Sequence, residues 1–350
     1  MKVLVTGANG FLGRAVVAAL TVDGHSVRAL VRPATDVSRL GWGGNVEVAR
    51  GDLRAGTDLA PLFAGVDAVV HLATQMTGDD FTILSGTLVG TERLLAAMAG
   101  STAKRLLLCS SFSVYDWLRA GAVLDDGAPL AEDVWSSGAY AAAKAWQERL
   151  ARRLAEQHGW QLTVLRPGFV WGRGNDDLAC IGQRLGRWQL VIGPLRKIPL
   201  THVDNCADAF RAVLAADNSA GDTYNVVDLL GTTAARYVRE QARGSGRGGF
   251  TLWIPFWAAN VLVWLANRCA RFLFGARYKL PSMFVPVRFA LRYKPVHATS
   301  TGLRQKLGWR APKSFQECVR ATWGPESGAS ANAPVPAAVK VEMDARRDAA

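Results

Sequence analysis

The chain of 350 residues has few cysteines, and their spacing fits neither a disulfide framework nor a zinc site. There are five, an odd number: Cys109, Cys180, Cys206, Cys269 and Cys318. This pattern argues against a disulfide-stabilised secreted domain and favours a reducing, cytoplasmic compartment. A secretory signal is also missing, because residues 1–13 already have the pattern of a strand and a loop. We therefore expect a cytoplasmic protein that holds no metal.

Acidic residues are scarce in one stretch near the C-terminus. Residues 235–323 contain 16 Lys and Arg but only 2 Asp and Glu, so this stretch carries a net charge of +14, against +12 for the whole chain. A basic surface attracts phosphates, nucleic acid or anionic lipids, and a merely solvated arginine-rich surface is an equally good interpretation. No nucleic-acid-binding motif accompanies the charge, so we do not expect nucleic acid as a partner.

A long hydrophobic run is also missing. Residues 250–275 are the most apolar segment, but its uninterrupted part is shorter than the ~20 residues of a membrane-spanning helix. Pro255 and Asn260 interrupt it, and Arg268 and Arg271 end it with charge. We expect this segment to pack in the core or to cover an apolar substrate pocket.

The alternative for residues 250–295 is a peripheral contact with a membrane, through a helix that lies in the interface. Tryptophans stand beside cationic side chains in this stretch, as such a helix requires. They are Trp253, Trp257 and Trp264, with Arg268, Arg271, Arg277 and Lys279.

The first 13 residues, MKVLVTGANGFLG, have the pattern of a buried strand, a glycine-rich turn and the start of a helix. Gly7 permits a tight turn, Gly10 lets the backbone approach a pyrophosphate, and Gly13 lets the helix pack closely on the strand. The amino end of the helix supplies N–H donors and partial positive charge. The spacing G-x-x-G-x-x-G therefore predicts a dinucleotide site.

Short apolar segments alternate with helical segments up to about residue 172, which predicts a doubly wound parallel sheet. The predicted strands cover residues 27–31, 46–49, 68–72, 105–109 and 162–165. Beyond residue 172 we predict an amphipathic helix over 180–191, a strand over 223–227 and a helix over 232–242.

Tyr140 and Lys144 are four residues apart in YAAAK, at the start of a predicted helix over 141–154. This spacing puts both side chains on one face of the helix. A tyrosine with its ordinary pKa near ~10 is a poor base at neutral pH, and a cation one turn away favours the phenolate. We therefore expect Lys144 to lower the pKa of Tyr140, to assist proton transfer and to hold the nicotinamide ribose.

These motifs resemble those of the extended short-chain dehydrogenase/reductase family, which includes NAD-dependent epimerases and dehydratases and 3β-hydroxysteroid dehydrogenase-like enzymes. TGANGFLG matches the family's fingerprint, Ser111 to Tyr115 matches its Ser-x-x-Val-Tyr, and His202 to Asp204 matches its His-Val-Asp segment. The resemblance covers residues 1–230 and implies a Rossmann-type α/β fold.

The resemblance also implies which residues serve the site. Ser111 would join Tyr140 and Lys144 as the third catalytic residue, with Ser113 as the backup candidate; a serine at this place could instead only cap the next segment. The cofactor would contact Gly7, Asn9, Gly10, Phe11, Leu12, Gly13, Asp52, Leu53, Leu72, Ala73, Thr74, Tyr140, Lys144 and Pro167.

The chain departs from the family pattern at two places. Thr87 stands where the family usually has the Asn of Asn-Val-x-Gly-Thr, which puts one helper position in doubt. Phe112 and Ser113 stand where the sugar-nucleotide dehydratases have an acid pair, so we do not expect a dehydratase.

The end of the second predicted strand bears on the choice of cofactor. Dinucleotide folds often have Asp or Glu there, which binds the ribose 2′-hydroxyl of NAD. This chain has Val31 followed by Arg32. A missing carboxylate beside a guanidinium favours a 2′-phosphate, so we expect NADP(H) rather than NAD(H); an Arg32 that only points to solvent is the alternative.

By the resemblance, residues 1–172 form the NAD(P)-binding domain, and residues 173–323 form a smaller, mainly helical substrate lobe with segments that return to the first domain. Residues 324–350, rich in Ala and Pro, form a disordered tail. A homodimer through helices of the first domain is common in the family.

We therefore expect an NAD(P)-dependent oxidoreductase that interconverts a secondary alcohol and a ketone on a lipophilic small-molecule substrate. A nucleotide-sugar epimerase of the same family is the runner-up. A membrane-surface or sensor module that only binds NADP(H) is the alternative from another class.

Overall fold

A computed structural model of the chain describes residues 1–56, 58–217, 219–228, 231–246, 249–274 and 280–325. Seven parallel strands form its central sheet, in the order β12-β7-β5-β4-β1-β2-β3. Their bounds are β1 Lys2–Thr6, β2 Ser26–Val31, β3 Val46–Arg50, β4 Ala68–His71, β5 Arg105–Cys109, β7 Gln161–Pro167 and β12 Thr223–Val226. This confirms the predicted Rossmann-type sheet, and each predicted strand is correct to within one or two residues at either end.

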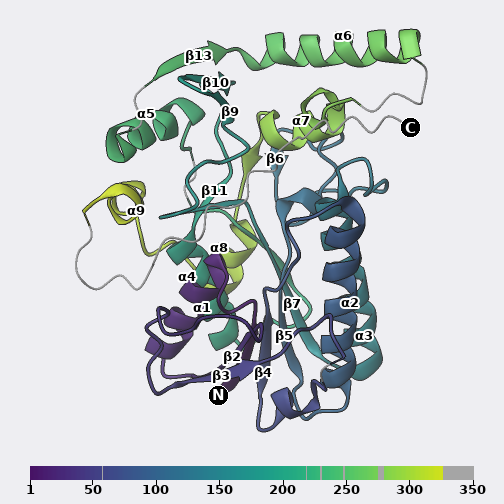
Figure 1. Cartoon of the computed structure of the whole chain (residues 1–350), viewed down its shortest axis with the longest axis vertical. Coiled ribbons are helices and arrows are strands. Elements are labelled where there is room, and N and C mark those ends of the chain that lie inside the picture. Colours follow the sequence, from purple (N-terminus) through teal and green to yellow (C-terminus); the bar gives the residue numbers. More distant parts are fainter. Residues whose placement is uncertain (57, 218, 229–230, 247–248, 275–279, 326–350) are drawn as a thin grey trace.

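Helices cover both faces of the sheet (Figure 1). Helices α1 (Phe11–Val22) and α4 (Val203–Ala215) enclose one hydrophobic core, and α2 (Asp80–Ala99) and α3 (Ala139–His158) lie on the opposite face. The chain builds β1, β2 and β3 toward one edge and then returns to build β4 on the other side of β1. This reversal is where open α/β sheets bind ligands.

A second, smaller group of elements lies beyond the carboxyl ends of these strands (Figure 1). It contains a three-stranded sheet of β9 (Gly182–Leu185), β10 (Trp188–Ile192) and β13 (Phe250–Ile254). Its helices are α5 (Ala234–Ser245), α6 (Phe256–Phe274) and α7 (Pro286–Tyr293).

The helix predicted over residues 180–191 is wrong, because these residues form the hairpin of β9 and β10. Gly186 turns the hairpin with a φ of +57°. A Cβ atom on Gly182 would lie 1.8 Å from the carbonyl oxygen of Leu190, so the two strands approach too closely for any larger residue. Gly182 and Gly186 indicate strands and a turn, but the prediction relied on the apolar spacing of residues 180–191, which resembles that of a helix.

The core packing predicted for residues 250–275 is wrong for most of the segment. In α6, Ala259 and Val263 are buried against Phe289 and Tyr293 of α7. The side chains on the other side of α6 are exposed, and Trp257 is 71% exposed. Among the described residues, no helix is both long and apolar enough to cross a membrane.

The remaining elements are short. They are β6 (Val123–Leu124), β8 (Phe169–Trp171), β11 (Leu200–His202), β14 (His297–Ala298), α8 (Thr301–Leu307) and α9 (Phe315–Trp323), with 3-10 helices at Ala60–Phe63, Phe112–Val114 and Ser282–Phe284. Of the predicted tail, residues 326–350 lie outside the described residues.

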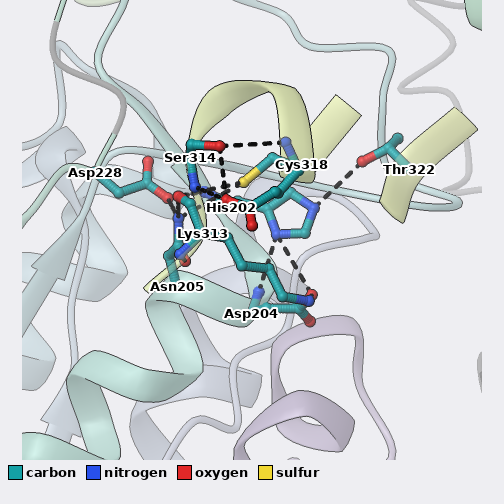
Figure 2. Close-up of polar contacts among 9 residues, drawn as sticks. His202, Asp204, Asn205, Asp228, Lys313, Ser314, Cys318 and Thr322 are labelled. Carbon is teal, nitrogen blue, oxygen red and sulfur yellow. Dashed lines mark hydrogen bonds and ion pairs between the residues drawn. The ribbon is translucent and has the colours of Figure 1, made fainter. Parts of the chain in front are cut away.

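The start of α9 is joined to the start of α4 by partly buried polar contacts (Figure 2). Asn205 Nδ2 donates to Asp228 Oδ2 at 2.5 Å and to the carbonyl oxygen of Lys313 at 2.9 Å, and its Oδ1 accepts from the Lys313 N–H at 2.9 Å. The Lys313 ammonium pairs with Asp204 at 2.5 Å. Asn205 and Asp204 therefore hold the start of α9 beside the start of α4.

Replacing Asn205 with alanine should lower the free energy of unfolding by about 2–3 kcal/mol, because three partly buried polar groups each lose one hydrogen bond. Urea unfolding followed by circular dichroism measures this difference. The matched control is Asn260→Ala, at an exposed asparagine of α6, which should change the free energy by less than ~0.5 kcal/mol. Equal effects of the two variants would contradict the role given to Asn205.

Candidate active site

The glycine-rich turn between β1 and α1 is shaped by close backbone contacts. Gly7 has a φ of +67°, and a Cβ atom there would lie 2.9 Å from the amide nitrogen of Ala73. A Cβ atom on Gly13 would lie 2.0 Å from the Gly7 carbonyl oxygen. Helix α1 begins after Gly10 with no side-chain cap and no acidic residue in its first turn. Its N–H groups therefore face an anion site that nothing in the turn obstructs.

The other predicted cofactor residues also lie at the carboxyl ends of the parallel strands. Leu72, Ala73 and Thr74 follow β4, Arg32 follows β2, Asp52 and Leu53 follow β3, and Pro167 ends β7. Thr6 joins the end of β1 to the segment after β4, because its hydroxyl accepts the Ala73 N–H at 3.3 Å and its carbonyl oxygen accepts the Leu72 N–H at 3.3 Å.

Three arginines lie around the ends of β2 and β3. Arg54 forms an ion pair with Asp52 at 2.9 Å, and the hydrogen bonds from Arg54 lower the pKa of Asp52 to about 2 despite its partial burial, with the charge of Arg32 adding to the effect. Arg50 donates to the carbonyl oxygens of Pro33 and Thr35, which fixes the loop after Arg32. Arg32 itself is exposed.

Ser111 and Tyr140 lie together beside the sheet. Ser111 follows β5 and Tyr140 is in the first turn of α3, and the Ser111 hydroxyl lies near enough to the Tyr140 hydroxyl to lower its pKa. Burial raises the pKa of Tyr140 to about 12, against the smaller lowering effect of the Ser111 hydrogen bond. The expectation that Lys144 lowers this pKa is wrong for this structure. At neutral pH Tyr140 is a phenol, which can donate a proton.

Lys144 is directed toward the strand ends rather than along α3. Only 2% of the residue is exposed, and burial lowers the pKa of its ammonium. Each of its three N–H groups has an acceptor: Thr74 Oγ1 at 2.5 Å, the Cys109 carbonyl oxygen at 2.8 Å and Gln147 Oε1 at 3.0 Å. The ammonium therefore connects the ends of β4 and β5 to the catalytic helix.

The position of α3 on the sheet is fixed by a buried ion pair. Glu148 on α3 accepts two hydrogen bonds from Arg166 on β7, at 2.9 and 2.7 Å, and both side chains are buried. Burial alone would raise the pKa of Glu148, but the hydrogen bonds and charge of Arg166 outweigh it and the pKa is lowered. Because Glu148 is four residues after Lys144, the pair also sets where Lys144 points.

Ser111 has a structural role as well. Its hydroxyl oxygen accepts the Ser113 N–H at 3.2 Å and caps the short helix over Phe112–Val114. Both the capping interpretation and the contact with Tyr140 therefore hold. Thr87, which replaces the family's asparagine, accepts the Gln75 N–H at 3.1 Å, so this position binds the backbone after β4.

Residues 3–227 match the model of the NAD dependent epimerase/dehydratase family. The chain belongs to this family. Membership confirms the resemblance seen in the sequence, and it makes the chain a nicotinamide-dinucleotide-dependent enzyme of the extended short-chain dehydrogenase/reductase type.

Two relatives in the family are ketone reductases by name. A 4-hydroxy-2-methyl-3-oxo-4-farnesyl-3,4-dihydroquinoline-1-oxide ketoreductase of Stigmatella aurantiaca is 32% identical over 239 residues, which are 65% of this chain and 68% of the relative. A 2-alkyl-3-oxoalkanoate reductase of Stenotrophomonas maltophilia is 34% identical over 241 residues, which are 64% of this chain and 69% of the relative.

The fold extends over almost the whole chain of a solved family member. The UDP-glucuronic acid 4-epimerase from Bacillus cereus, in complex with UDP-glucuronic acid and NAD, aligns with a TM-score of 0.69 at 21% identity. The alignment covers 92% of this chain and 98% of the epimerase. At this identity the likeness establishes the shared fold.

The family's dinucleotide fits the glycine-rich turn on an observation independent of the family match. The backbone around Gly7 and Gly13 closes so tightly that no side chain fits, while the uncapped amino end of α1 leaves N–H donors for a pyrophosphate. Among the described residues, no group of three or more His, Cys, Asp or Glu side chains is placed to hold a metal ion.

Lys144 is connected to a buried hydrogen-bond network through Gln147, and the sequence analysis singled out neither Gln147 nor His71 of this network. Gln147 Nε2 donates to Thr91 Oγ1 at 2.8 Å and lies 3.0 Å from His71 Nε2, while His71 Nδ1 lies 2.6 Å from Thr6 Oγ1. A neutral His71 that carries its proton on Nδ1 accounts for the contacts with Thr6 and Gln147. Gln147 is three residues after Lys144 on the same face of α3, which was the available signal.

The buried ring of His71 should make stability depend on pH. Burial, and secondarily the charge of Lys144, lower the pKa of His71 to about 3 in the folded chain. The unfolded chain takes up this proton below a pH of ~6.5, so stability is complete above that pH and is lost as the pH falls toward the folded pKa. Lowering the pH from 7 to 5 should cost about 2 kcal/mol from this group alone.

Urea unfolding at the two pH values measures the loss, and His71→Asn should remove this part of it whatever the variant does to stability at neutral pH. An unchanged pH dependence in the variant would show that His71 is not the group responsible.

Proposed function

We propose that the chain is an NADP(H)-dependent reductase of ketones that carry a long apolar chain. The arrangement of Ser111, Tyr140 and Lys144 beside the glycine-rich turn carries the proposal. The direction is supported by the two relatives, which are reductases by name, and Tyr140, protonated at neutral pH, can supply the proton. The substrate class is supported by the two reductases to which the chain is similar, since both names combine a 3-oxo group with an alkyl or farnesyl chain.

The proposed reaction uses each of the three side chains once. The reduced nicotinamide, when bound, supplies a hydride to the carbonyl carbon. Tyr140 gives its phenolic proton to the carbonyl oxygen, and Ser111 donates a hydrogen bond that steadies the charge developing there. Lys144 would hold the nicotinamide ribose.

Thr74 is the contact of Lys144 that the ribose would replace. Thr74 follows the end of β4, where the order of the strands reverses. The other two acceptors, the Cys109 carbonyl oxygen on β5 and Gln147 on α3, belong to the sheet and the helix themselves. Exchange of one acceptor for another keeps all three N–H groups of Lys144 satisfied, so the buried cation needs no new desolvation when the cofactor binds.

The 2′-phosphate of NADP(H) is assigned to Arg32. Val31 at the end of β2 is buried, apolar and unable to bind a ribose 2′-hydroxyl, while the exposed Arg32 follows it on a loop that Arg50 braces. Asp52 is already paired with Arg54, so it does not compete for the Arg32 guanidinium as a partner.

A homodimer through α2 and α3 is the assembly we propose. Their outer faces expose Phe81, Val89 and Trp146, and the exposed fraction of Trp146 is 42%. Pairing two copies of this helix pair would cover these side chains.

The competing functions predict other behaviour. A nucleotide-sugar epimerase would keep its cofactor through turnover, so purified protein would release NAD(H) on denaturation. A sensor that only binds NADP(H) would respond to cofactor in the same way with or without the Tyr140 hydroxyl.

Tyr140→Phe should lower the turnover of a 2-alkyl-3-oxoalkanoate about 10³-fold or more, because the proton donor is lost, while NADPH affinity stays within about twofold. Ser111→Ala should cost about 10²-fold. Consumption of NADPH, followed by its absorbance, measures both. Ser113→Ala, at the neighbouring buried serine, is the matched control and should change turnover little. A larger loss in Ser113→Ala than in Ser111→Ala would transfer the catalytic role to Ser113.

Arg32→Ala should weaken NADPH binding about 10- to 100-fold, since a charge-assisted hydrogen bond to the 2′-phosphate is lost, and should leave NADH binding within about twofold. Equilibrium titration by fluorescence gives both constants. Arg39→Ala, at an exposed arginine farther along the same loop, controls for general charge and should preserve the preference. Tight NADH binding that ignores Arg32 would rule out the NADP(H) assignment.

A further inference from the structure

Helix α6 is apolar around almost its whole circumference, but the described residues cover only one side of it. Ala259, Val263 and Ala270 form the buried side, one to two turns apart. The opposite side presents large apolar residues at helical spacing, namely Trp257, Val261, Leu262, Trp264, Leu265 and Phe272. A helix with this composition is normally enclosed in a core or in lipid.

The exposure extends to the strands that precede α6. Of the 24 large hydrophobic side chains that the described residues expose, ten lie between Phe250 and Leu273. Phe250 and Leu252 of β13 belong to them, and the ring of Phe250 packs 5.2 Å from the ring of Trp188 on β10. We call the outward side chains of β13 and α6, together with Trp188, the α6 surface. It lies at one end of the molecule, along the green helix at the top of Figure 1.

The charge at the edge of the α6 surface has one sign. Residues 249–274 contain no Asp or Glu. Arg268 lies over the Trp264 ring with 5.6 Å between the guanidinium carbon and the ring centroid, and Arg187 lies over Phe250 at 5.6 Å. Arg271 is exposed one turn further on. Arginines and tryptophans around an apolar centre are the composition of an interfacial membrane-binding helix.

From this combination we infer that the α6 surface binds an anionic lipid bilayer, with α6 lying in the plane of the interface. A second copy of the chain fits the surface less well. A twofold contact through α6 would bring Arg268 and Arg271 of both copies into one interface, and neither copy has an acid on α6 to pair with them. Lipid phosphates supply that partner.

The α6 surface is connected to the catalytic helix by α7. The buried side of α6 packs on Phe289 of α7, and Arg288 of α7 donates to the Ser136 carbonyl oxygen at 3.2 Å, four residues before Tyr140. On the proposed reductase function, an apolar ketone dissolved in the bilayer would therefore reach the enzyme on the side where α3 begins. Membrane binding itself does not depend on that function.

Flotation of the full-length protein with vesicles tests the inference. Vesicles of phosphatidylcholine with phosphatidylglycerol should bind the protein, vesicles of phosphatidylcholine alone should bind it less, and high salt should weaken the binding. Trp257→Ala should lower the partition constant about tenfold, and Arg271→Ala about fivefold. The matched controls are Trp135→Ala and Arg153→Ala, at exposed residues outside the α6 surface, and both should bind as the wild type does.

Protein that floats with neither kind of vesicle would overturn the inference. So would a dimer, seen by sedimentation velocity without lipid, that Trp257→Ala dissociates and Trp135→Ala does not. NADPH binding by each variant confirms that it is folded, and Tyr140→Phe should float normally, which separates failure of the membrane surface from failure of the proposed reaction.

Discussion

A buried ammonium group is the constraint on which the active site depends. Removing the charge of Lys144 from water is costly unless each of its N–H groups finds an acceptor. The acceptors come from three different places: Thr74 after β4, the carbonyl oxygen of Cys109 on β5, and Gln147 one turn further along α3. They meet only if β4 and β5 pair in this register and α3 lies at one particular position along the strands. The buried ion pair of Glu148 on α3 and Arg166 on β7 fixes that position.

The same cation explains why a histidine beneath it is kept neutral. His71 is fully enclosed, and its ring reaches Lys144 through Gln147, so a second positive charge there would be both desolvated and repelled. The neutral ring joins Thr6 to Gln147 and thereby links the glycine-rich turn after β1 to the catalytic helix. The glycine-rich turn and Lys144 are thus connected by hydrogen bonds across the end of the sheet. This connection restricts how far either of them can move independently.

Sequence predicted what depends on local spacing and missed what depends on which strands become neighbours. The glycine-rich turn, the strands and the Tyr140–Lys144 pair have signatures within a few residues. The role of His71 arises only because β4 lies between β1 and β5, and the acceptor at Cys109 is a backbone atom with no sequence signal. The pKa of Tyr140 is raised because the phenol is buried, and the spacing of Tyr140 and Lys144 along the helix does not show that burial.

For helix α6 the sequence could not predict whether protein or lipid would cover its apolar side chains. An apolar segment has the same composition whether protein or lipid encloses it, so periodicity could not choose between a core helix and an interfacial one. The structure distinguishes the two cases by which side chains are buried. Val263 packs with Phe289 and Tyr293, whereas Trp257 and Phe272 are exposed among the described residues. The excess positive charge of residues 235–323 did not indicate a ligand from the sequence alone. In the structure Arg268 and Arg271 border the uncovered face, so part of this charge lies where an anionic surface would bind. A surface that is apolar at its centre and cationic at its edge is complementary to anionic lipid and not to itself.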